Sequence, residues 1–247
     1  GAGSLTDNGV AVVAGQFITL ADIGGGNLKF TPVANANGAA YASFTFQVQD
    51  DGGTANGGVD LDATPNTMTV NVTPVNDAPA GANNTVTTNE DTAYTFVTAD
   101  FGFTDPSDSP ANALSAVTVT TLPGAGSLTD NGVAVAAGQS VTLADINAGL
   151  LVFTPAANAN GAGYASFDFR VQDDGGTLNG GADTDPGAHT ITVNVTTVND
   201  APQGANNSVT ALEDTAYAFA TVDFGFADPS DTPANNLLAV KITTLPG

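Results

Sequence analysis

The stretch ASFDFRVQ, residues 165–172, shows most directly which fold this chain adopts. Its apolar residues Phe167, Phe169 and Val171 alternate with polar ones. A second stretch, TITVNV at residues 190–195, alternates in the same way. This period of two residues is typical of antiparallel strands that bury one face.

Further short stretches with strand character lie between clusters of Gly, Pro, Asn and Asp, which favour turns. They are residues 84–88, 93–99, 114–122, 133–136, 140–143 and 150–154. A single helical turn is expected around residues 144–147. Short strands separated by frequent turns predict an all-β fold of Ig-like antiparallel β-sandwich domains.

The chain carries these patterns twice. GAGSLTDNG at residues 1–9 returns at 124–132, and VNDAP at residues 75–79 returns at 198–202. Each pair is offset by 123 residues, and roughly three quarters of the aligned positions are identical. A repeat of this length is a whole domain and not one turn of a solenoid. Near-identical tandem domains favour a structural or adhesive array over separate chemistries.

The domain boundary is predicted at VNDAP, because a strand runs directly into this motif and Pro ends ladder pairing. We therefore predict the C-terminal part of one domain at residues 1–77 and a complete domain at 78–200. Residues 201–247 would then be the N-terminal part of the next domain. The two incomplete parts add up to one domain, and we interpret the chain as a piece of a longer polypeptide.

Composition narrows the possible partners. Lys29, Arg170 and Lys241 are the only cations against 25 acids, which gives a net charge of −22. Nucleic acids and anionic membranes both require basic patches, so neither is an expected partner. All acids except Glu90 and Glu213 are Asp, a short and hard ligand for cations. Together with the absence of Cys, this pattern suggests a secreted protein that is held together by metal.

VNDAP followed by Glu-Asp-Thr at residues 90–92 and 213–215 resembles the bacterial cadherin-like repeats of giant secreted, RTX-type adhesins. FTPAANANG at residues 153–161 and VQDDGG at 171–176 fit the same pattern. The resemblance covers the whole chain and implies cadherin-like β-sandwich domains in a linear array, outside the cell or at its surface. It also implies Ca²⁺ at the domain junctions. The strict cadherin linker has two more polar ligands where this chain has Val75 and Ala78, so the sites here are expected to hold fewer ions.

The resemblance implies two calcium sites, each formed by a linker and by loops of the two neighbouring domains. The first comprises Asn76, Asp77, Asp105, Asp108, Asp173 and Asp174. The second comprises Glu90, Asn199, Asp200, Asp228 and Asp231. The set is completed by Asp50, Asp51 and Glu213, the repeat partners of Asp173, Asp174 and Glu90. Calcium takes roughly six to eight oxygen ligands of these kinds. The alternative is that Asp, Asn and Gly crowd these loops only because turns favour them.

No enzyme is predicted. His189 is the only His, and its repeat partner is Asn66, so no catalytic base is repeated. The segment 183–185, Asp-Thr-Asp, is interpreted as a flexible acidic turn, with cation binding inside the loop as the alternative.

The leading functional hypothesis is an extracellular structural rod of a repetitive cell-surface adhesin or fibre, stiffened by Ca²⁺. Its partners would be neighbouring repeats of the same chain or head-to-tail copies. Two alternatives stay open: repeats that bind a ligand or a surface glycan directly, and subunits of a filament joined by strand complementation. The second alternative follows from residues 1–77 and 201–247, because each segment contains the part of the domain that the other lacks.

Overall fold

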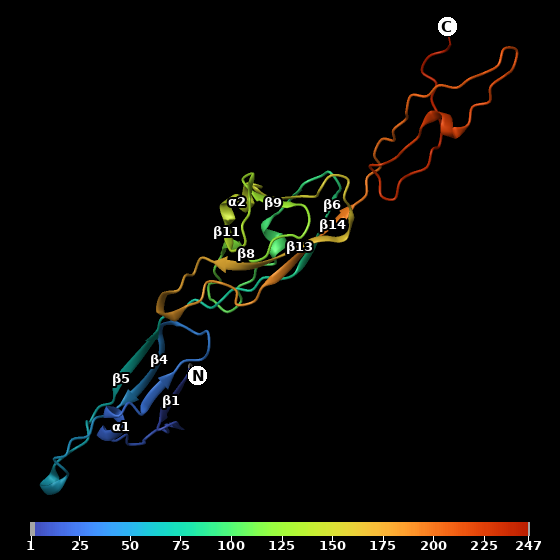
Figure 1. Ribbon diagram of the computed structural model, residues 1–247. Coiled ribbons are helices and arrows are strands. Elements are labelled where there is room, and N and C mark those ends of the chain that lie inside the picture. Colours follow the sequence, from blue (N-terminus) through green and yellow to red (C-terminus); the bar gives the residue numbers. More distant parts are fainter. Residues whose placement is uncertain (1–2, 247) are drawn as a thin grey trace. The chain divides into compact units, whose positions relative to one another are not determined.

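The computed structural model describes residues 3–246 and is mostly β (Figure 1), which confirms the predicted fold class. Residues 1 and 2 of the predicted segment 1–77 lie outside the described part of the chain, and so does residue 247 of the predicted segment 201–247. One compact unit contains the residues up to Asp77 together with Ser107–Ala111 and Thr177–Gly181. The other contains Ala78–Pro106, Asn112–Gly176 and the residues from Ala182 onward. The domain boundaries at 77/78 and 200/201 stay predictions.

Residues 84–196 form two sheets, which we call the central sandwich (Figure 1). One sheet has the strand order β11-β8-β13-β14-β6, and the other has the order β10-β9-β12-β7. The strands are β6 (Asn84–Asn89), β7 (Tyr94–Thr95), β8 (Leu114–Val119), β9 (Ser127–Asp130), β10 (Val133–Ala134), β11 (Gln139–Thr142), β12 (Leu151–Thr154), β13 (Gly161–Asp173) and β14 (His189–Thr196). The helical pieces are η2 (Thr98–Phe101), α2 (Leu143–Asn147) and η3 (Leu178–Gly180). The helical turn expected near residue 144 is therefore present.

One strand pair departs from the expectation of purely antiparallel sheets. β6 and β14 run parallel, with Asn84 opposite Ile191 and Val86 opposite Val193. The antiparallel prediction is wrong for this pair because the first strand of the sandwich lies beside its last strand. No hairpin joins these two strands, so nothing forces them to run in opposite directions.

The core lies between the two sheets and confirms the alternation seen in the sequence. Phe167 and Phe169 of β13 are buried, and their rings meet two other buried rings edge to face. The Phe167 ring lies 5.5 Å from Phe96, and the Phe169 ring lies 5.0 Å from Phe101. Burying one such side chain stabilises the fold by about 1.5–3 kcal/mol, and edge-to-face pairs add to this.

Residues 3–77 repeat part of this arrangement. Their elements are β1 (Ser4–Asp7), β2 (Val10–Ala11), α1 (Leu20–Gly24), β3 (Leu28–Thr31), β4 (Gly38–Phe46), η1 (Ala55–Gly57) and β5 (Asn66–Val72). They form one sheet of order β2-β1-β3 and one of order β4-β5. β4 stops at Phe46, whereas its repeat counterpart β13 continues past Phe169 to Asp173. The part of β13 from Phe169 onward pairs with β8, and no described strand pairs with β4 in this way.

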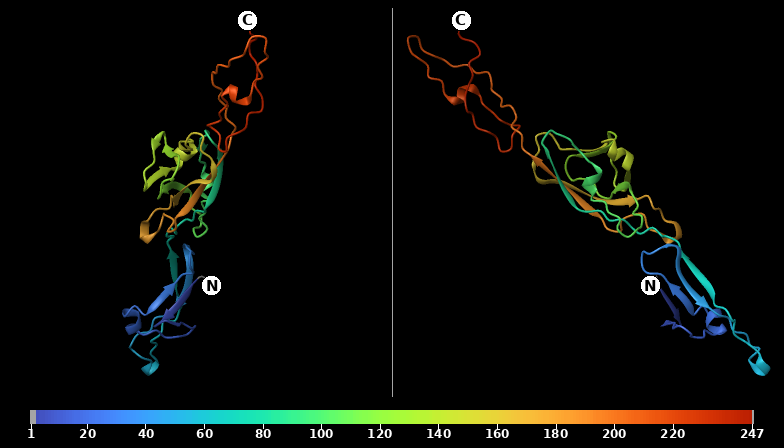
Figure 2. Two further views of the ribbon diagram at one scale, coloured as in Figure 1. Left: turned by 45° about the vertical axis from the view of Figure 1, so that its right-hand side comes forward. Right: turned by 180° about the vertical axis from the view of Figure 1, so that it is seen from behind.

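Residues 201–246, red in Figure 2, form no strand among the described residues, although they repeat the sequences of β6, β7 and β8. Only the local features persist, namely η4 (Thr221–Phe224) and the bridge between Gln203 and Ala227. Asp223 holds η4 by accepting a hydrogen bond from the Ala220 amide at 2.8 Å. The stretches of this segment that repeat β6, β7 and β8 are therefore not strands in the chain taken alone. Ladder hydrogen bonds require a partner strand, whereas a capped turn does not.

Candidate metal centre

Three carboxylates from distant parts of the sequence meet at the linker that follows β14. One oxygen each from Glu90, Asp200 and Asp231 lies within 4.8 Å of the other two. All three residues belong to the same compact unit. Glu90 and Asp231 are more than nine-tenths buried, and Asp200 is half-buried. We call these residues, with Asp228, the linker cluster.

Glu90 is held firmly at the end of β6. Its amide donates to the carbonyl of Thr196 at 2.9 Å, which continues the pairing with β14. Its Oε1 accepts from the Val198 amide at 2.6 Å, and its Oε2 accepts from Nδ2 of Asn160 at 2.9 Å. The carboxylate is thus fixed between the last strand of the sandwich and the linker.

The loop at residues 228–235 reaches the same linker. The Asp200 amide donates to both Asp231 oxygens, at 3.2 and 3.3 Å. Asn235 donates from Nδ2 to Oδ2 of Asp231 at 3.1 Å and to Oδ1 of Asn199 at 2.8 Å. Its amide donates to Oδ2 of Asp228 at 2.6 Å. Asn235 therefore orients two carboxylates and one linker amide oxygen at once.

The linker cluster is strongly negative, and no described cation balances it. The pKa of Asp200 is raised, first by desolvation and then by the charges of Asp231, Asp91, Glu90 and Asp228. Among residues 3–246 the one ion pair is that between His189 and Asp185, which involves none of these groups. Like charges held this close repel one another unless a cation lies between them.

Two oxygens of this cluster have no hydrogen-bond partner. They are Oδ2 of Asp200 and Oδ1 of Asp228, and both atoms are buried. A buried carboxylate oxygen without a partner is costly, and a bound cation would satisfy it. Carboxylate and amide oxygens are the hard ligands that Ca²⁺ prefers, so the residues present fit that ion.

The first predicted site repeats two of these local features. The Asp77 amide donates to Oδ2 of Asp108 at 2.9 Å, as Asp200 does to Asp231. Oδ2 of Asp105 accepts from the Asn112 amide at 2.6 Å, and its buried Oδ1 has no partner, as in Asp228.

The residues of this first site fall into two groups. Asn76, Asp77 and Asp108 belong to one compact unit, whereas Asp105, Asp173 and Asp174 belong to the other. Their meeting around a single ion therefore stays a prediction.

Turn chemistry accounts for other candidates. Oδ1 of Asp173 accepts from the Gly175 amide at 2.9 Å, and Oδ1 of Asp50 accepts from the Gly52 amide at 2.9 Å. Oδ1 of Asp174 accepts from the Ala113 amide at 2.8 Å. The contacts of Asp173 and Asp50 support the turn alternative for these two residues, whereas the Asp174 contact joins two segments that are 61 residues apart in the sequence. Asp51 and Glu213 are exposed, and the described residues place neither in a group of three acids.

Asp185 contradicts the prediction of a flexible acidic turn. It is 4% exposed and accepts hydrogen bonds from the amides of Gly81 and Gly187, at 2.7 and 2.8 Å. Nε2 of His189 lies 2.7 Å from its Oδ2. Burial alone would raise the pKa of Asp185, but these hydrogen bonds and His189 outweigh it and lower the pKa. Asp185 is therefore a structural anchor for residue 81.

Three residues near the linker cluster were missed by the sequence reasoning. Asn160 and Asn235 bind its carboxylates directly, as described above. Asp91 contributes to the raised pKa of Asp200, and its Oδ1 accepts from the Asn158 amide at 3.0 Å. Signals for two of them existed, since Asp91 follows Glu90 in the Glu-Asp-Thr motif and Asn160 belongs to FTPAANANG.

The family comparison matches residues 75–193 to the model of the cadherin-like domain. These residues are therefore similar to cadherin-like domains. The matched range begins in the linker before the central sandwich and ends within β14. The matched range thus contains Glu90 and Asp105, while Asp200 and Asp231 follow it. No curated protein and no solved structure is significantly similar to the chain.

The described residues 3–246 contain only short helices. None of the helices within residues 3–246 combines the length and the apolar character that crossing a bilayer requires.

Proposed function

We propose that the chain is a non-catalytic, extracellular rod segment of a repetitive adhesin or fibre, and that Ca²⁺ at its linkers stiffens it. The cadherin-like domain at residues 75–193 supports an adhesion-type extracellular repeat. The observation that carries the calcium part is the linker cluster, with its unpartnered oxygens on Asp200 and Asp228.

The origin of the ligands explains how an ion would act. Glu90 follows β6, Asp200 belongs to the linker, and Asp228 and Asp231 belong to the loop beyond it. An ion held by all of them would tie the linker to the residues on both sides. Without the ion the same carboxylates repel, and the linker gains freedom. Binding and order at the linker are therefore coupled.

A calcium titration tests this proposal directly. Extracellular calcium modules bind with dissociation constants of about 10⁻⁴–10⁻³ M. At about 10 mM free calcium, which is about 10–100 times that constant, binding stabilises the folded state by about 1.4–2.7 kcal/mol. Isothermal titration and calorimetric melting should therefore both respond to millimolar calcium. Magnesium should act more weakly, because it demands a small and nearly octahedral oxygen shell.

Matched variants separate the linker cluster from general acidity. Asp231→Asn removes one charge and one ligand, and we expect at least a tenfold weaker calcium affinity. Asp7→Asn makes the same charge change at a residue whose carboxylate accepts from Asn8, and it should bind calcium normally. Equal affinity in the two variants would contradict the proposal.

Two further variants separate metal binding from turn capping. Asp200→Ala and Asp77→Ala should lower thermal stability in calcium and have much smaller effects in chelator. Equal losses in both conditions would indicate capping, since an Asx cap needs no metal. Solution scattering completes the test, because removal of calcium should change the radius of gyration of the native chain.

A further inference from the structure

The single histidine of this chain takes part in a contact between the loop before β14 and the segment that leads into β6. We propose that His189 makes this contact respond to pH: a protonated imidazole holds Asp185 in the position in which it binds the Gly81 amide. We call these three residues the entry clamp. They lie within one compact unit, and the inference does not depend on the calcium proposal.

Asp185 is the centre of the entry clamp. Its Oδ2 lies 2.7 Å from the Gly81 amide and 2.7 Å from Nε2 of His189. Its Oδ1 accepts from the Gly187 amide at 2.8 Å. Asp185 is only 4% exposed, so water competes little for these oxygens. The clamp therefore joins the segment before the first strand of the central sandwich to the segment before its last strand.

The imidazole ring packs directly against the glycine. A Cβ on Gly81 would lie 2.9 Å from Cδ2 of His189 and 3.4 Å from the Phe169 ring. The His189 ring centroid lies 5.9 Å from that of Phe169. The His189 side chain is still 23% exposed. Its neighbours thus fix the ring in place, while the exposed part lets it exchange protons with water.

Asp185 is the charged group that His189 meets. The other titratable groups on the elements around the clamp are Asp100 in η2, Asp183 in the loop, and Asp168 and Arg170 in β13. Asp100 accepts from the Val97 amide at 2.9 Å, and Asp183 accepts from Gln172 at 3.0 Å. Asp168 and Arg170 alternate with buried residues of β13 and therefore point to its outer face. Residues 78–82 contain no titratable side chain.

The first repeat contains the same contact without a titratable partner. Asp62 and Asn66 are the counterparts of Asp185 and His189. Asn66 donates from Nδ2 to Oδ2 of Asp62 at 2.6 Å, and the Thr64 amide donates to Oδ1 at 3.0 Å. An asparagine at position 189 is therefore expected to keep the hydrogen bond, but it cannot gain a charge.

The charge states define the pH range of the clamp. Burial alone would raise the pKa of Asp185, but the amides of Gly81 and Gly187 and the contact with His189 outweigh it and lower the pKa. The carboxylate is therefore charged above its ordinary pKa of 3.8. Histidine ordinarily loses its proton near pH ~6.5. A hydrogen bond between two ions is roughly twice as strong as a neutral one. We therefore expect the clamp to be tightest between about pH 4 and about pH 6 and to weaken as the pH rises.

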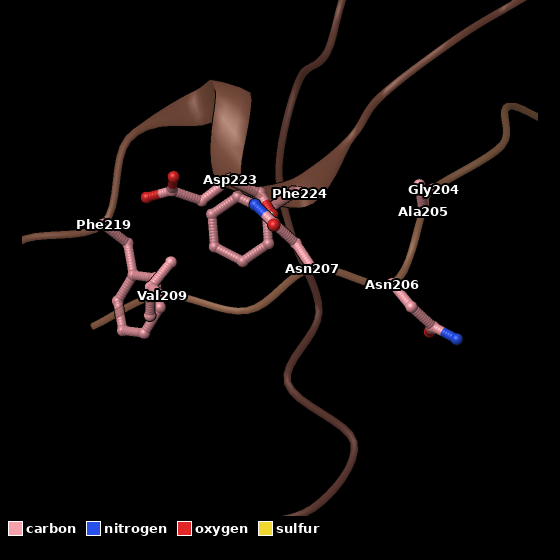
Figure 3. Close-up of a pocket in the computed structure, with 8 residues that line it drawn as sticks. All are labelled: Gly204, Ala205, Asn206, Asn207, Val209, Phe219, Asp223 and Phe224. Atoms are coloured by element: carbon pink, nitrogen blue, oxygen red, sulfur yellow. The ribbon is translucent and has the colours of Figure 1, made fainter.

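The counterpart of Gly81 shows which contacts form without the clamp. Gly204 lies in the wall of the hollow drawn in Figure 3. The next amide, that of Ala205, donates to the Phe224 carbonyl at 3.2 Å, just as the Ala82 amide donates to a carbonyl at 3.1 Å. The Gly204 amide itself has no acceptor among residues 3–246. The bond of the Gly81 amide is therefore the specific contribution of the clamp, and this amide reports on it.

Hydrogen exchange of the full chain, followed by NMR in chelator, tests the proposal. After correction for intrinsic exchange rates, protection of the Gly81 amide should be about threefold to tenfold higher at about pH 5.5 than at about pH 8. The Ala82 amide, which donates to a carbonyl, should change little and serves as the internal reference. Because the chain has one His, its ring signals report the charge of His189 in the same samples. Equal protection of Gly81 at the two pH values would overturn the proposal.

Two variants identify the source of the response. His189→Asn keeps the contact that Asn66 makes in the first repeat, so its Gly81 protection should not depend on pH. Thr192→His, added to that variant, places a histidine between two buried residues of β14 and thus on its outer face. This second chain should also show no response. A response that persists in His189→Asn, or that returns with Thr192→His, would contradict a role for the clamp.

Melting temperatures provide a second measurement that does not depend on one amide. The difference between the native chain and His189→Asn should be larger at about pH 5.5 than at about pH 8, by on the order of 2–5 °C. Asp185→Asn removes the carboxylate, so adding His189→Asn to it should no longer change the pH dependence. An equal effect of His189→Asn with and without the Asp185 carboxylate would show that the imidazole acts through another group and would refute the clamp.

Discussion

Phe169 and its repeat counterpart Phe46 lie in different environments. The same substitution can therefore be compared at a buried and at a partly exposed position. Phe169 is completely buried, 5.0 Å from the Phe101 ring and 5.9 Å from the His189 ring. Phe46, its repeat counterpart, is 36% exposed, and no ring contact involves it among the described residues. We therefore expect Phe169→Ala and Phe46→Ala to differ widely in cost.

The magnitudes follow from burial. Truncation of a fully buried Phe to Ala costs about 3–5 kcal/mol, because it removes apolar contact and leaves a cavity. For a domain of this size that loss corresponds to a fall in the melting temperature on the order of 10–20 °C. A partly exposed Phe on an open sheet has less contact to lose, and we expect about 1 kcal/mol or less for Phe46→Ala.

Differential scanning calorimetry of dilute, monomeric chain is the appropriate assay. The main transition should belong to the central sandwich, shift strongly in Phe169→Ala and hardly move in Phe46→Ala. Chelator should be present, so that calcium binding does not contribute to either value. Equal shifts in the two variants would refute the reasoning, because they would mean that Phe46 is packed as closely as Phe169.

Three further predictions concern pH and backbone conformation. Because the pKa of Asp185 is lowered, this carboxylate stabilises the fold at pH values above its ordinary pKa of 3.8. The contribution is lost as the pH falls through the pKa of the folded state. Asp185→Asn should therefore make the melting temperature depend less on pH in the acid range. The raised pKa of Asp200 has the opposite sign. In chelator the ordered linker should gain stability as pH falls toward 3.8, seen as a higher exchange protection factor at the Val198 amide, and an unchanged factor would contradict this. Gly126→Ala should destabilise more than Gly138→Ala in urea unfolding. Both residues have positive φ, which costs about 1–2 kcal/mol for Ala, but only at Gly126 would the Cβ also clash, 2.6 Å from a core phenylalanine ring. Similar losses at the two glycines would show that the core yields freely.

The sequence predicted the central sandwich well because its strands follow a period of two and are bounded by turn residues. The alternation of Phe167, Phe169 and Val171 translates directly into buried positions. The same reasoning failed for residues 201–246, where an equally alternating pattern forms no strand. Alternation specifies which face a strand would bury, but the ladder itself depends on a partner that the pattern does not contain.

For the candidate site, the resemblance to cadherin-like repeats implied Glu90, Asp200 and Asp231, which the fold brings together. The sequence could not show which carboxylates accept hydrogen bonds from backbone amides. Asp173 caps a turn, and Asp185 lies buried among amides, although neither differs in chemistry from Asp200. The distinction depends on local backbone direction, which composition and spacing do not determine.

The parallel pairing of β6 and β14 has a mechanical consequence for any chain of such domains. The first and last strands of the central sandwich lie side by side and point the same way, from the Asn84–Ile191 pair to the Asn89–Thr196 pair. A pulling force therefore enters at one end of this pair and leaves at the other. It loads all the hydrogen bonds of the pair together, in shear, and does not open them one after another as when a hairpin is unzipped. A tether built from such domains would resist sudden tension, since the whole ladder must yield in a single step before the domain can extend.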